Sequence, residues 1–558
     1  MIPSMLFVAA EAIPLAKTGG LGDVVSGLAR ALQARGCDIT ILMPGYPDAI
    51  ARAQDLRNLG GLRLPLDLPA GHGATRLLSG RLPGSSVKVV LLDCAALYDR
   101  GGSIYMDGAG RDFVDNPLRF ATLSHAAAAV AAGRTALPIP DVVHAHDWHA
   151  ALTPLLMQRA GVTVPSILTI HNLAFQGLCP LAMAPLLGLP DDCLGPDGME
   201  FWGQLNFLKA GIRYANRVTT VSRAYAGEIL TPRFGHGLDG LLQSRRDVLS
   251  AIPNGVDTHA WDPATDALLP QTYRVDALAG KRACKAALQQ RLGLPADPFA
   301  PLVAQGSRLT HQKMADVALN AIEAVLAARP NVQFAILGCG DPRLEQGYRE
   351  LAERHPARVG VAIGYREECA HLLHAGADIL LHGSRFEPFG LTPVYAMRYG
   401  TVPVVSRVGG MIDTVRDAGD DLAAPTPGST GFSFEGETAE DMTAALHRAL
   451  HWFGHATPWH GLQSAGMRMP CGWDEPARGY LDIYSTLAPR RTPIVVQHAA
   501  RLDGGPATCS TAQLAELPAG AMPAPGALPA LPENVPRRQS QRRPARPLGD
   551  GLPAVTPA

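Results

Sequence analysis

The sequence predicts an α/β protein with two doubly wound domains and a separate C-terminal tail. Three observations carry this prediction. Short apolar segments alternate with longer amphipathic ones in two series, a polar stretch separates the series, and the composition changes after residue 487. The chain of 558 residues is also too long for a single hydrophobic core.

The first series predicts a domain over residues 1–262. Its apolar segments are short, and several are separated by stretches with helical periodicity, which is typical of strands in a parallel sheet. The predicted strands are residues 5–10, 38–43, 87–92, 141–144 and 166–170.

The second series predicts a domain over residues 263–487. The segment "IPNGVDTHAWDP" (252–263) and a polar stretch up to residue 293 form the predicted connection, and we expect a cleft to open there. A helix is predicted over 315–326. The predicted strands are residues 301–305, 332–337, 359–363, 378–381 and 402–405.

The tail, residues 488–558, is rich in proline, alanine and glycine and has little apolar periodicity. Such a composition cannot bury enough surface to become ordered, so we predict a disordered tail with no catalytic role. Its basic cluster "RRQSQRRPARP" (537–547) could contact nucleic acid or an acidic partner, but a solvated tail is the favoured interpretation.

Charge and composition exclude several classes of function. The 49 basic and 50 acidic residues give a net charge of −1, so neither nucleic acid nor an anionic membrane is an expected partner. No apolar stretch has the length of a membrane span, and the start lacks the pattern of a signal peptide, which predicts a cytoplasmic protein. The nine cysteines form no C-x-x-C pair, which favours reduced, mostly buried thiols over disulfides or zinc.

The segment "KTGGLGDV" (17–24) lies between a predicted strand and a predicted helix. Gly19, Gly20 and Gly22 permit positive φ and close backbone approach, so the helix N-terminus could bind a phosphate to which Lys17 adds a charge. A glycine turn that serves packing alone is the alternative. The spacing is not G-x-G-x-x-G, which disfavours a nicotinamide site and an NAD-dependent oxidoreductase.

The segment "SRLTHQK" (307–313) follows the first strand of the second series. Ligands of open α/β sheets bind at the carboxyl ends of strands, so Arg308 and Lys313 could together bind a diphosphate and stabilise its charge as it leaves. The alternative is a pair of solvated loop cations.

The segment "SRFEPFGLTPVYAMRYG" (384–400) follows another predicted strand. Glu387 precedes a proline and is therefore extended, while Gly390, Leu391 and Thr392 begin a helix that could bind a second anion. Glu387 could then hydrogen-bond a sugar or ribose hydroxyl. The alternative role for Glu387 is that of a first-turn acid favoured by the helix dipole.

Histidines end two further predicted strands. In "DVVHAHDWHA" (141–150) we interpret His146 as a hydrogen-bond donor to a ligand and its two neighbouring histidines as support, because no recognised metal-site spacing is present. In "TIHNLAFQG" (169–177), His171 and Asn172 lie beside Phe175 and Gln176. Polar groups next to an aromatic ring are suited to a sugar.

In order along residues 5–487, the motifs of the chain resemble those of bacterial glycogen synthases. The motifs are "KTGGLGDV", "MPGYPD", "DNPLRF", "VVHAHDWHA", "TIHNLAFQG", "EFWGQLNFLKAGI", "IPNGVD", "SRLTHQK", "LGCGDP", "IGY", "SRFEPFGLTPVYAMRYGTVP" and "GGMIDTV". The resemblance implies two Rossmann-like domains facing across a cleft, the GT-B arrangement. It also implies a last helix, "WDEPARGYLDIY" (473–484), that crosses back to the first domain.

The same resemblance implies a retaining glucosyltransferase that transfers glucose from ADP-glucose to the non-reducing end of an α-1,4-glucan, with no metal and no cofactor. The family's reaction is described as front-face substitution, in which the departing phosphate oxygen helps deprotonate the acceptor. The absence of a carboxylate pair suited to double displacement agrees with this description.

Site residues are implied by matching positions. The residues implied to neutralise the diphosphate are Lys17, Arg308 and Lys313. Those implied to contact it nearby are Gly20, Gly390, Leu391 and Thr392. The residues implied to contact the transferred glucose are Glu387, His146 and Asp115, with the His146 carbonyl near the anomeric carbon. Further donor contacts are implied for Asn172, Asn254, Gln312 and Tyr365.

The sequence departs from the family pattern at Phe389 and Pro393, where Cys and Gln are common, while Tyr395 is ordinary for glycogen synthases. These two positions bear on donor preference rather than on reaction class. A related glucosyltransferase that uses UDP-glucose and a non-catalytic glucan-binding scaffold stay open as alternatives.

Overall fold

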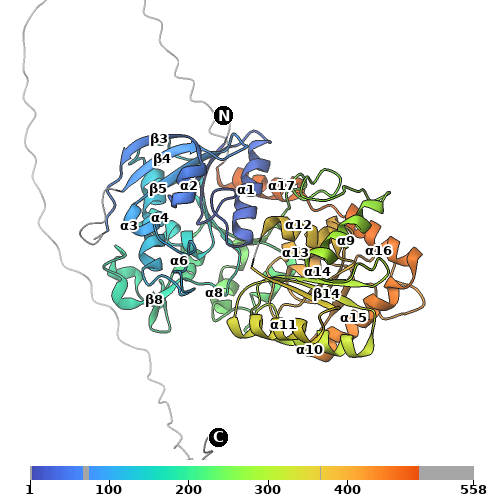
Figure 1. Ribbon diagram of the computed structural model, residues 1–558. Helices are drawn as coiled ribbons and strands as arrows, with labels where there is room; N and C mark the ends of the chain where they lie inside the picture. The colour runs from blue at the N-terminus through green and yellow to red at the C-terminus, as the bar shows by residue number, and fades with distance from the viewer. Residues whose placement is uncertain (1–2, 67–74, 365, 489–558) are drawn as a thin grey trace, which may run out of the picture. The chain divides into compact units, whose positions relative to one another are not determined.

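The computed structural model describes residues 3–66, 75–364 and 366–488, which fall within one compact unit, Met1–Thr492. These residues form two large sheets and one small one (Figure 1). The predicted disordered tail lies almost wholly outside the described residues.

The first sheet has nine strands in the order β12-β11-β7-β6-β1-β2-β5-β4-β3. The first seven in this order are parallel, and β4 and β3 are antiparallel at one edge. Their bounds are β1 (Ser4–Val8), β2 (Asp38–Pro44), β3 (Gln54–Gly61), β4 (Arg76–Arg81), β5 (Lys88–Asp93), β6 (Val142–His146), β7 (Ser166–Ile170), β11 (Arg217–Thr220) and β12 (Leu249–Ala251). The chain winds outward in both directions from β1 and β6.

The helices of this part follow the strands and pack into a shared core. In α1 (Gly20–Gln33), Val24, Val25, Leu28 and Leu32 recur at helical spacing and are all buried. The other helices are α2 (Pro47–Arg52), α3 (Ala95–Tyr98), α4 (Asn116–Ala131), α5 (Thr153–Arg159), α6 (Phe207–Tyr214), α7 (Arg223–Glu228) and α8 (Asp239–Ser244). A small antiparallel sheet of β8 (Leu178–Pro180), β10 (Gln204–Asn206) and β9 (Glu200–Phe201) lies before α6.

The second sheet is entirely parallel, in the order β15-β14-β13-β16-β17-β18. Its strands are β13 (Leu302–Gly306), β14 (Gln333–Gly338), β15 (Val359–Ile363), β16 (Ile379–His382), β17 (Val402–Ser406) and β18 (Phe432–Phe434). In chain order this is 3-2-1-4-5-6, the doubly wound arrangement. The prediction of two doubly wound α/β sheets is confirmed.

Both faces of the second sheet are buried. Val303 packs into one hydrophobic core, whereas its neighbours Leu302 and Ala304 pack into the other, as the alternation of side chains along a strand requires. The covering helices are α9 (Ala279–Arg291), α10 (Ala315–Ala328), α11 (Pro342–Arg354), α12 (Glu367–Gly376), α13 (Leu391–Arg398), α14 (Gly410–Thr414), α15 (Ala439–Phe453) and α16 (Ala456–Arg468).

The last helix, α17 (Asp474–Leu487), packs against α1 and the core of the first sheet (Figure 1). Tyr484 Oη lies 2.8 Å from His144 Nδ1, and Tyr480 Oη lies 3.4 Å from Thr169 Oγ1. Trp473 is buried in the same core. The C-terminal helix therefore completes the core that the N-terminal strands begin.

The predicted strands agree with the structure within two residues at their ends, but several strands were not predicted. Strand β3 is exposed along most of its length, so it lacks the apolar alternation that reveals a half-buried strand. Of the eight cysteines among the described residues, six are buried, in line with the prediction. A search of the same residues finds no helix with the length and apolar character needed to cross a membrane.

Candidate functional site

The winding of each sheet reverses between two adjacent parallel strands: β1 and β6 in the first, β13 and β16 in the second. Ligands of open α/β sheets bind beyond the carboxyl ends of strands at such a reversal. The four loops that leave these strands contain the glycine turn, the histidine motif, the "SRLTHQK" motif and Glu387. Both reversal points therefore carry the predicted ligand-binding motifs.

The glycine turn begins α1 without using the positive φ that its glycines permit. Gly19 is the N-cap with an extended φ of −154°, and neither Gly20 nor Gly22 has a positive φ. Two of these glycines instead allow neighbouring atoms to approach the backbone closely. A Cβ on Gly20 would lie 2.8 Å from Leu391 Cδ1, and one on Gly22 would lie 3.1 Å from the Ala16 carbonyl oxygen.

The glycine turn is held by Glu11, a buried residue that the sequence analysis missed. Its carboxylate accepts hydrogen bonds from the Thr18 amide at 2.7 Å, the Gly19 amide at 3.2 Å and the Tyr105 hydroxyl at 2.6 Å. An acid directly after an apolar strand was the available signal. Glu11 fixes the position from which the N-terminus of α1 is presented.

Lys17 lies at the start of this turn and contacts two carboxylates. Its Nζ is 3.1 Å from Asp23 Oδ1 and 3.8 Å from Glu367 Oε2. Burial raises the pKa of Asp23 to about 6, and the nearby Lys17 only partly offsets this effect. Lys17 thus links the first turn of α1 to the first turn of α12, two elements that belong to different sheets.

Glu387 lies at the centre of a buried polar cluster after β16. Its Oε2 accepts from Lys313 Nζ, from Ser384 Oγ at 3.2 Å and lies 3.3 Å from His382 Nε2. Although burial acts to raise the pKa of Glu387, Lys313 and His382 outweigh it and hold that pKa well below its usual range. Glu387 is therefore an ionised carboxylate, extended before Pro388 as predicted.

Arg308 and Gln312 lie beside this cluster. Arg308 is exposed, and its Nη2 donates to Gln312 Oε1 at 3.0 Å. Gln312 Nε2 in turn donates to the Phe386 carbonyl at 3.3 Å, next to Glu387. Of the two predicted diphosphate cations in the second part of the chain, Lys313 is thus paired with a buried acid, whereas Arg308 is open to solvent.

Helix α13 begins at Leu391, with Gly390 as the N-cap at a φ of +87°. This left-handed conformation is one that glycine adopts at little cost. Thr392 is the second helical residue and Pro393 the third. Because the first amides of a helix have no partner within it, Pro393 removes no helical hydrogen bond.

Phe389, the other departure from the family pattern, lies in the core, as does Tyr395, which is ordinary for the family. Phe389 is 6% exposed and packs with the hydrophobic core of the second sheet. Tyr395 stacks on Trp261 with ring centroids 3.9 Å apart and an interplanar angle of 13°. Both side chains belong to the hydrophobic core against which α13 packs.

The histidines after β6 form a buried, neutral cluster. His146 Nδ1 lies 3.1 Å from His171 Nε2, and burial holds the pKa of His146 far below its ordinary value. The pKa of His171 falls to about 3 for the same reason. His146 Nε2 is buried without a hydrogen-bond partner among the described residues. The same residues contain no group of three or more His, Cys, Asp or Glu arranged to hold a metal ion.

Asp147 connects the histidine motif to the loop after β7. It adopts a positive φ of 60°, which is unusual for a residue other than glycine, and its Oδ1 accepts from the His171 amide at 3.2 Å and the Asn172 amide at 3.4 Å. Burial raises the pKa of Asp147 to about 7. Sequence reasoning missed this residue, although it stands within the quoted histidine motif.

Two predicted site residues have other surroundings, and a third is not among the described residues. Asp115, at the start of α4, forms an ion pair with Arg100 at 2.6 Å. The backbone N–H of Asn254 donates to the Val221 carbonyl at 3.2 Å. Tyr365 lies outside the described residues.

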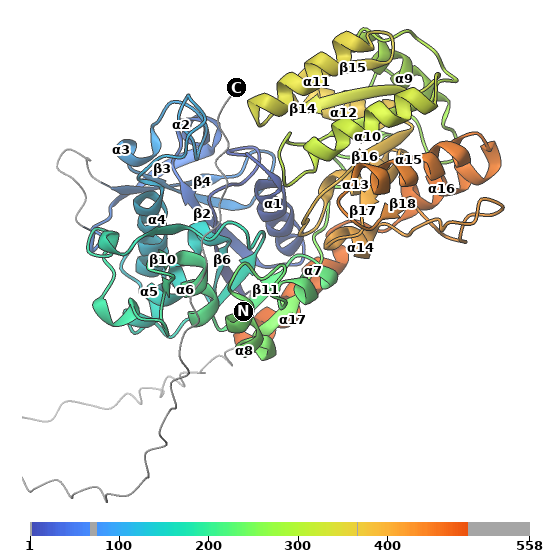
Figure 2. The ribbon, with the colours of Figure 1, turned by 90° about the horizontal axis from the view of Figure 1, so that it is seen from below.

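Several contacts join loops of the first sheet to loops of the second. Ser222 Oγ donates to the Pro388 carbonyl at 2.6 Å, beside Glu387, and the Gly409 amide donates to Glu228 Oε1 at 2.8 Å. Helices α7 and α14 lie side by side here (Figure 2). Together with the approach of Gly20 to Leu391, these contacts bring the glycine turn and the Glu387 loop to one place.

Comparisons with known proteins agree on one family. The family model of the starch synthase catalytic domain matches residues 4–244, and that of glycosyl transferases group 1 matches residues 290–452. The chain is 55% identical to a glycogen synthase of Ralstonia nicotianae over 491 residues, covering 88% of this chain and 89% of that one. It is 53% identical to a glycogen synthase of Burkholderia thailandensis, covering 87% and 91%.

Solved structures give the same fold. The catalytic domain of starch synthase IV from Arabidopsis thaliana, bound to ADP and acarbose, is 30% identical with a TM-score of 0.78, covering 88% of this chain and 100% of that one. A sucrose-phosphate synthase of Thermosynechococcus elongatus, 17% identical with a TM-score of 0.53 over 87% and 99% of the chains, shares the fold.

Proposed function

The chain belongs to the glycogen synthase family, and we propose that it transfers glucose from ADP-glucose to the non-reducing end of an α-1,4-glucan. The observation that carries this proposal is the buried, ionised Glu387 beside Lys313 and the start of α13. A carboxylate that accepts hydrogen bonds next to an anion site is the combination that a sugar diphosphate requires.

The diphosphate would be bound by cations and by the start of α13. We propose that Arg308 and Lys313 approach it from the second sheet and Lys17 from the first, with Gly20, Gly390, Leu391 and Thr392 nearby. A helix N-terminus presents unpaired amides and a positive dipole end, and cations stabilise the charge that develops on the leaving phosphate. These protein groups would provide the neutralisation, and no cofactor is part of the proposal.

The transferred glucose would lie between Glu387 and the loops after β6 and β7. Glu387 would accept hydrogen bonds from its hydroxyls, with His146 and Asp115 on the opposite side and the His146 carbonyl near the anomeric carbon. The neutral state of His146 and its unpaired Nε2 support a role as a hydrogen-bonding group. Further donor contacts are proposed for Asn172, Asn254, Gln312 and Tyr365.

The front-face mechanism of the family fits this set of groups. The departing phosphate oxygen would take the proton of the acceptor hydroxyl, so no protein nucleophile is needed, and the protein's role is to orient both sugars and stabilise the diphosphate. We assign residues 1–262 mainly to the acceptor and residues 263–487 to the nucleotide sugar. A cytoplasmic location stays a prediction of the sequence.

The deciding experiment measures glucose incorporation into glycogen from ADP-glucose and, separately, from UDP-glucose, without added metal. Glu387→Ala is the test variant, and Glu323→Ala is its control, because Glu323 forms an exposed ion pair with Arg354 on α10 and α11. We expect transfer from ADP-glucose that only Glu387→Ala abolishes. Transfer from UDP-glucose alone would change the donor, and transfer from neither would favour the non-catalytic scaffold.

A further inference from the structure

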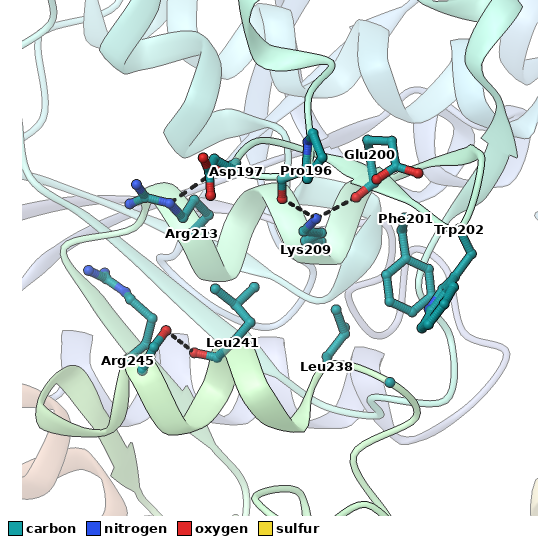
Figure 3. A pocket seen from close by; sticks show the side chains of 12 residues that line it. Pro196, Asp197, Glu200, Phe201, Trp202, Lys209, Arg213, Leu238, Leu241 and Arg245 are labelled. Atoms are coloured by element: carbon teal, nitrogen blue, oxygen red, sulfur yellow. Dashed lines mark hydrogen bonds between the residues drawn. The ribbon is translucent and has the colours of Figure 1, made fainter. Parts of the chain in front are cut away.

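A cavity of about 760 Å³ lies in the first part of the chain, between the β9–β10 hairpin, α6 and α8 (Figure 3). None of the residues assigned above to the donor or to the transferred glucose lines it. Its volume is in the range of cavities that bind small ligands. Its lining combines an aromatic pair, cations and carboxylates.

The tip of the hairpin displays a tryptophan to solvent. Trp202 is 82% exposed, and it shares the two-residue turn between β9 and β10 with Gly203. Both turn residues have positive φ, 53° and 79°, as a type I′ turn requires. Asn, Asp and Gly favour that conformation, whereas a bulky residue there is an outlier. Neither packing nor the turn explains an exposed indole at this position.

The indole of Trp202 and the ring of Phe201 lie next to each other and against Gly237. The rings of Phe201 and Trp202 have centroids 6.2 Å apart and meet at 78°. A Cβ on Gly237, at a φ of +79°, would lie 2.9 Å from Phe201 Cζ and 3.5 Å from Trp202 Nε1. Glycine is therefore needed for the chain to pass beneath the rings, and the cavity stays open beside them.

The opposite wall carries polar groups with spare hydrogen-bonding capacity. Lys209 Nζ donates to the Pro196 carbonyl at 2.7 Å and to the Glu200 carbonyl (Figure 3). Arg213 Nε donates to the Asp197 carbonyl at 3.3 Å, and Arg245 Nη2 donates to the Ala215 carbonyl. Within the described residues no charged side chain of this wall forms an ion pair.

Cations and carboxylates face the cavity together, so the wall does not select strongly for one sign of charge. Such a wall can hydrogen-bond the hydroxyls of a neutral ligand, while an aromatic face packs against the C–H face of a sugar ring. A phosphate or nucleotide would meet Asp197 and Glu200 as well as the cations. The lining therefore favours a neutral polyhydroxyl compound over an anion.

We propose that this cavity binds a segment of an α-glucan chain, with Trp202 stacked on a glucose ring. The choice of an α-glucan rests on the proposed function, since the lining alone indicates a neutral sugar. The cavity would hold the polymer while one of its chain ends is extended at the transfer site.

The cavity is connected to that site through one residue. His236, directly before Gly237, accepts a hydrogen bond on its carbonyl from Gln176 at 3.1 Å. Its ring lies 5.6 Å from that of Phe386, the neighbour of Glu387. His236 therefore contacts Phe386, next to Glu387, while its chain neighbour Gly237 lines the cavity.

The test uses the full chain with Trp202→Asn, which removes the indole and places a residue that favours the turn. Phe299→Asn is the matched control, because Phe299 is 85% exposed in a loop before β13. Binding of maltoheptaose is measured by calorimetry without donor, and initial rates from ADP-glucose are compared for glycogen and maltotriose. Inorganic phosphate is titrated in parallel.

We expect Trp202→Asn to weaken maltoheptaose binding and raise the KM for glycogen by roughly fivefold to tenfold, the range typical of losing one aromatic contact. The kcat/KM ratio of glycogen over maltotriose should fall accordingly, and Phe299→Asn should behave as the wild type. Equal effects in both variants, or none, would overturn the proposal, as would phosphate binding that depends on Arg213 without any sugar binding. If the wild type transfers no glucose, the binding measurement still decides the inference.

Discussion

Glu387 combines deep burial with a full negative charge, and its neighbours explain how both are possible. Lys313 supplies the opposite charge, while Ser384 and His382 lie within 3.3 Å of the same carboxylate oxygen. Burying an unpaired carboxylate costs several kcal/mol, so the cluster must form as a unit. The second oxygen, Oε1, has no partner among the described residues and is the atom that we expect to face the sugar.

Replacing Glu387 by glutamine tests this role at the level of one atom. The amide keeps the size of the side chain but removes the charge opposite Lys313. We expect turnover to fall by roughly 100-fold or more, as for the loss of one preorganised electrostatic contact. The measurement is kcat with ADP-glucose and glycogen, with far-ultraviolet circular dichroism to confirm folding. Turnover near that of the wild type would exclude Glu387 from the reaction.

Arg308 and Lys313, two of the three proposed diphosphate cations, should differ in what their removal does to stability. Arg308→Ala removes an exposed side chain, so we expect a loss of about 3 kcal/mol of transition-state stabilisation with unchanged stability. Lys313→Ala should lose similar activity and also destabilise the fold by roughly 3 kcal/mol, because it leaves Glu387 buried without its partner. Kinetics and urea unfolding of both variants separate the effects. Normal activity in both would place the diphosphate elsewhere.

The buried histidines predict how stability depends on pH. The pKa of His171 is about 3 in the folded protein against an ordinary 6.5. Between these values the unfolded chain binds a proton that the folded chain does not, so stability rises with pH by roughly 1 kcal/mol per unit. His144, His146 and His149 act in the same direction. Asp147, whose pKa is raised to about 7 by burial, opposes them between about pH 4 and 7.

We therefore expect the unfolding free energy to rise between pH 5 and 6.5, and His171→Asn to reduce that slope by roughly 1 kcal/mol per pH unit. Urea unfolding at a series of pH values gives both slopes. Asp147→Asn serves as the opposite control, since removing its carboxyl should make the slope steeper. Parallel slopes in all three proteins would show that His171 titrates as a solvated histidine.

At the scale of elements, glycines determine which helices can meet. Trp473, at the start of α17, lies against Gly27 of α1 and Gly255. A Cβ on Gly27 would lie 2.3 Å from Trp473 Nε1, and one on Gly255 would lie 2.7 Å from Trp473 Cδ2. An indole is rigid, so neither position has room for a methyl group. Trp473 is thus held between two stretches of backbone distant from it in the sequence.

Gly27→Ala should therefore destabilise the protein, although alanine normally favours a helix. We expect a loss of about 1–3 kcal/mol, the usual cost of overpacking a core. Gly461→Ala in α16 is the control, because a Cβ there meets nothing within 4 Å and alanine should stabilise the helix by roughly 0.5–1 kcal/mol. Thermal unfolding distinguishes the two. Similar gains in both variants would mean that Trp473 moves aside freely.

The sequence predicts the buried strands well and the glycine turn only in part. Strand β7 was predicted over its full extent: Pro165 and His171 bound it in the sequence, and all five of its residues are buried. Position 20 was identified as a glycine needed for close approach, but its neighbour Leu391 lies 371 positions later in the chain. Local pattern cannot reveal such a partner, nor which of the two freedoms that glycine permits the turn uses.

On the scale of the whole molecule, the sequence could not show that Glu11 and Asp147 organise the loops of the site. Both are single acids whose importance comes from amides and hydroxyls brought together by the sheet. The switch points of the two sheets are likewise properties of topology. Motif residues at strand ends were recognisable because the α/β pattern itself indicates which ends converge. Their contacts across the two sheets required the structure.

The last prediction concerns where the chain can be shortened. Ending it after residue 489 removes the segment predicted to be a tail, and we expect unchanged activity and thermal stability. Ending it after residue 472 also removes α17, so His144 would lose the Tyr484 hydroxyl and the first core would lose Trp473, Ala477 and Tyr480. Exposing that core should cost several kcal/mol and abolish activity, although no proposed site residue has been deleted. Glucose transfer and thermal unfolding of the two truncations decide the matter. Activity lost in the chain that ends after residue 489 would show that residues 490–558 act at the site. Activity kept in the chain that ends after residue 472 would show that α17 only covers a core that is stable without it.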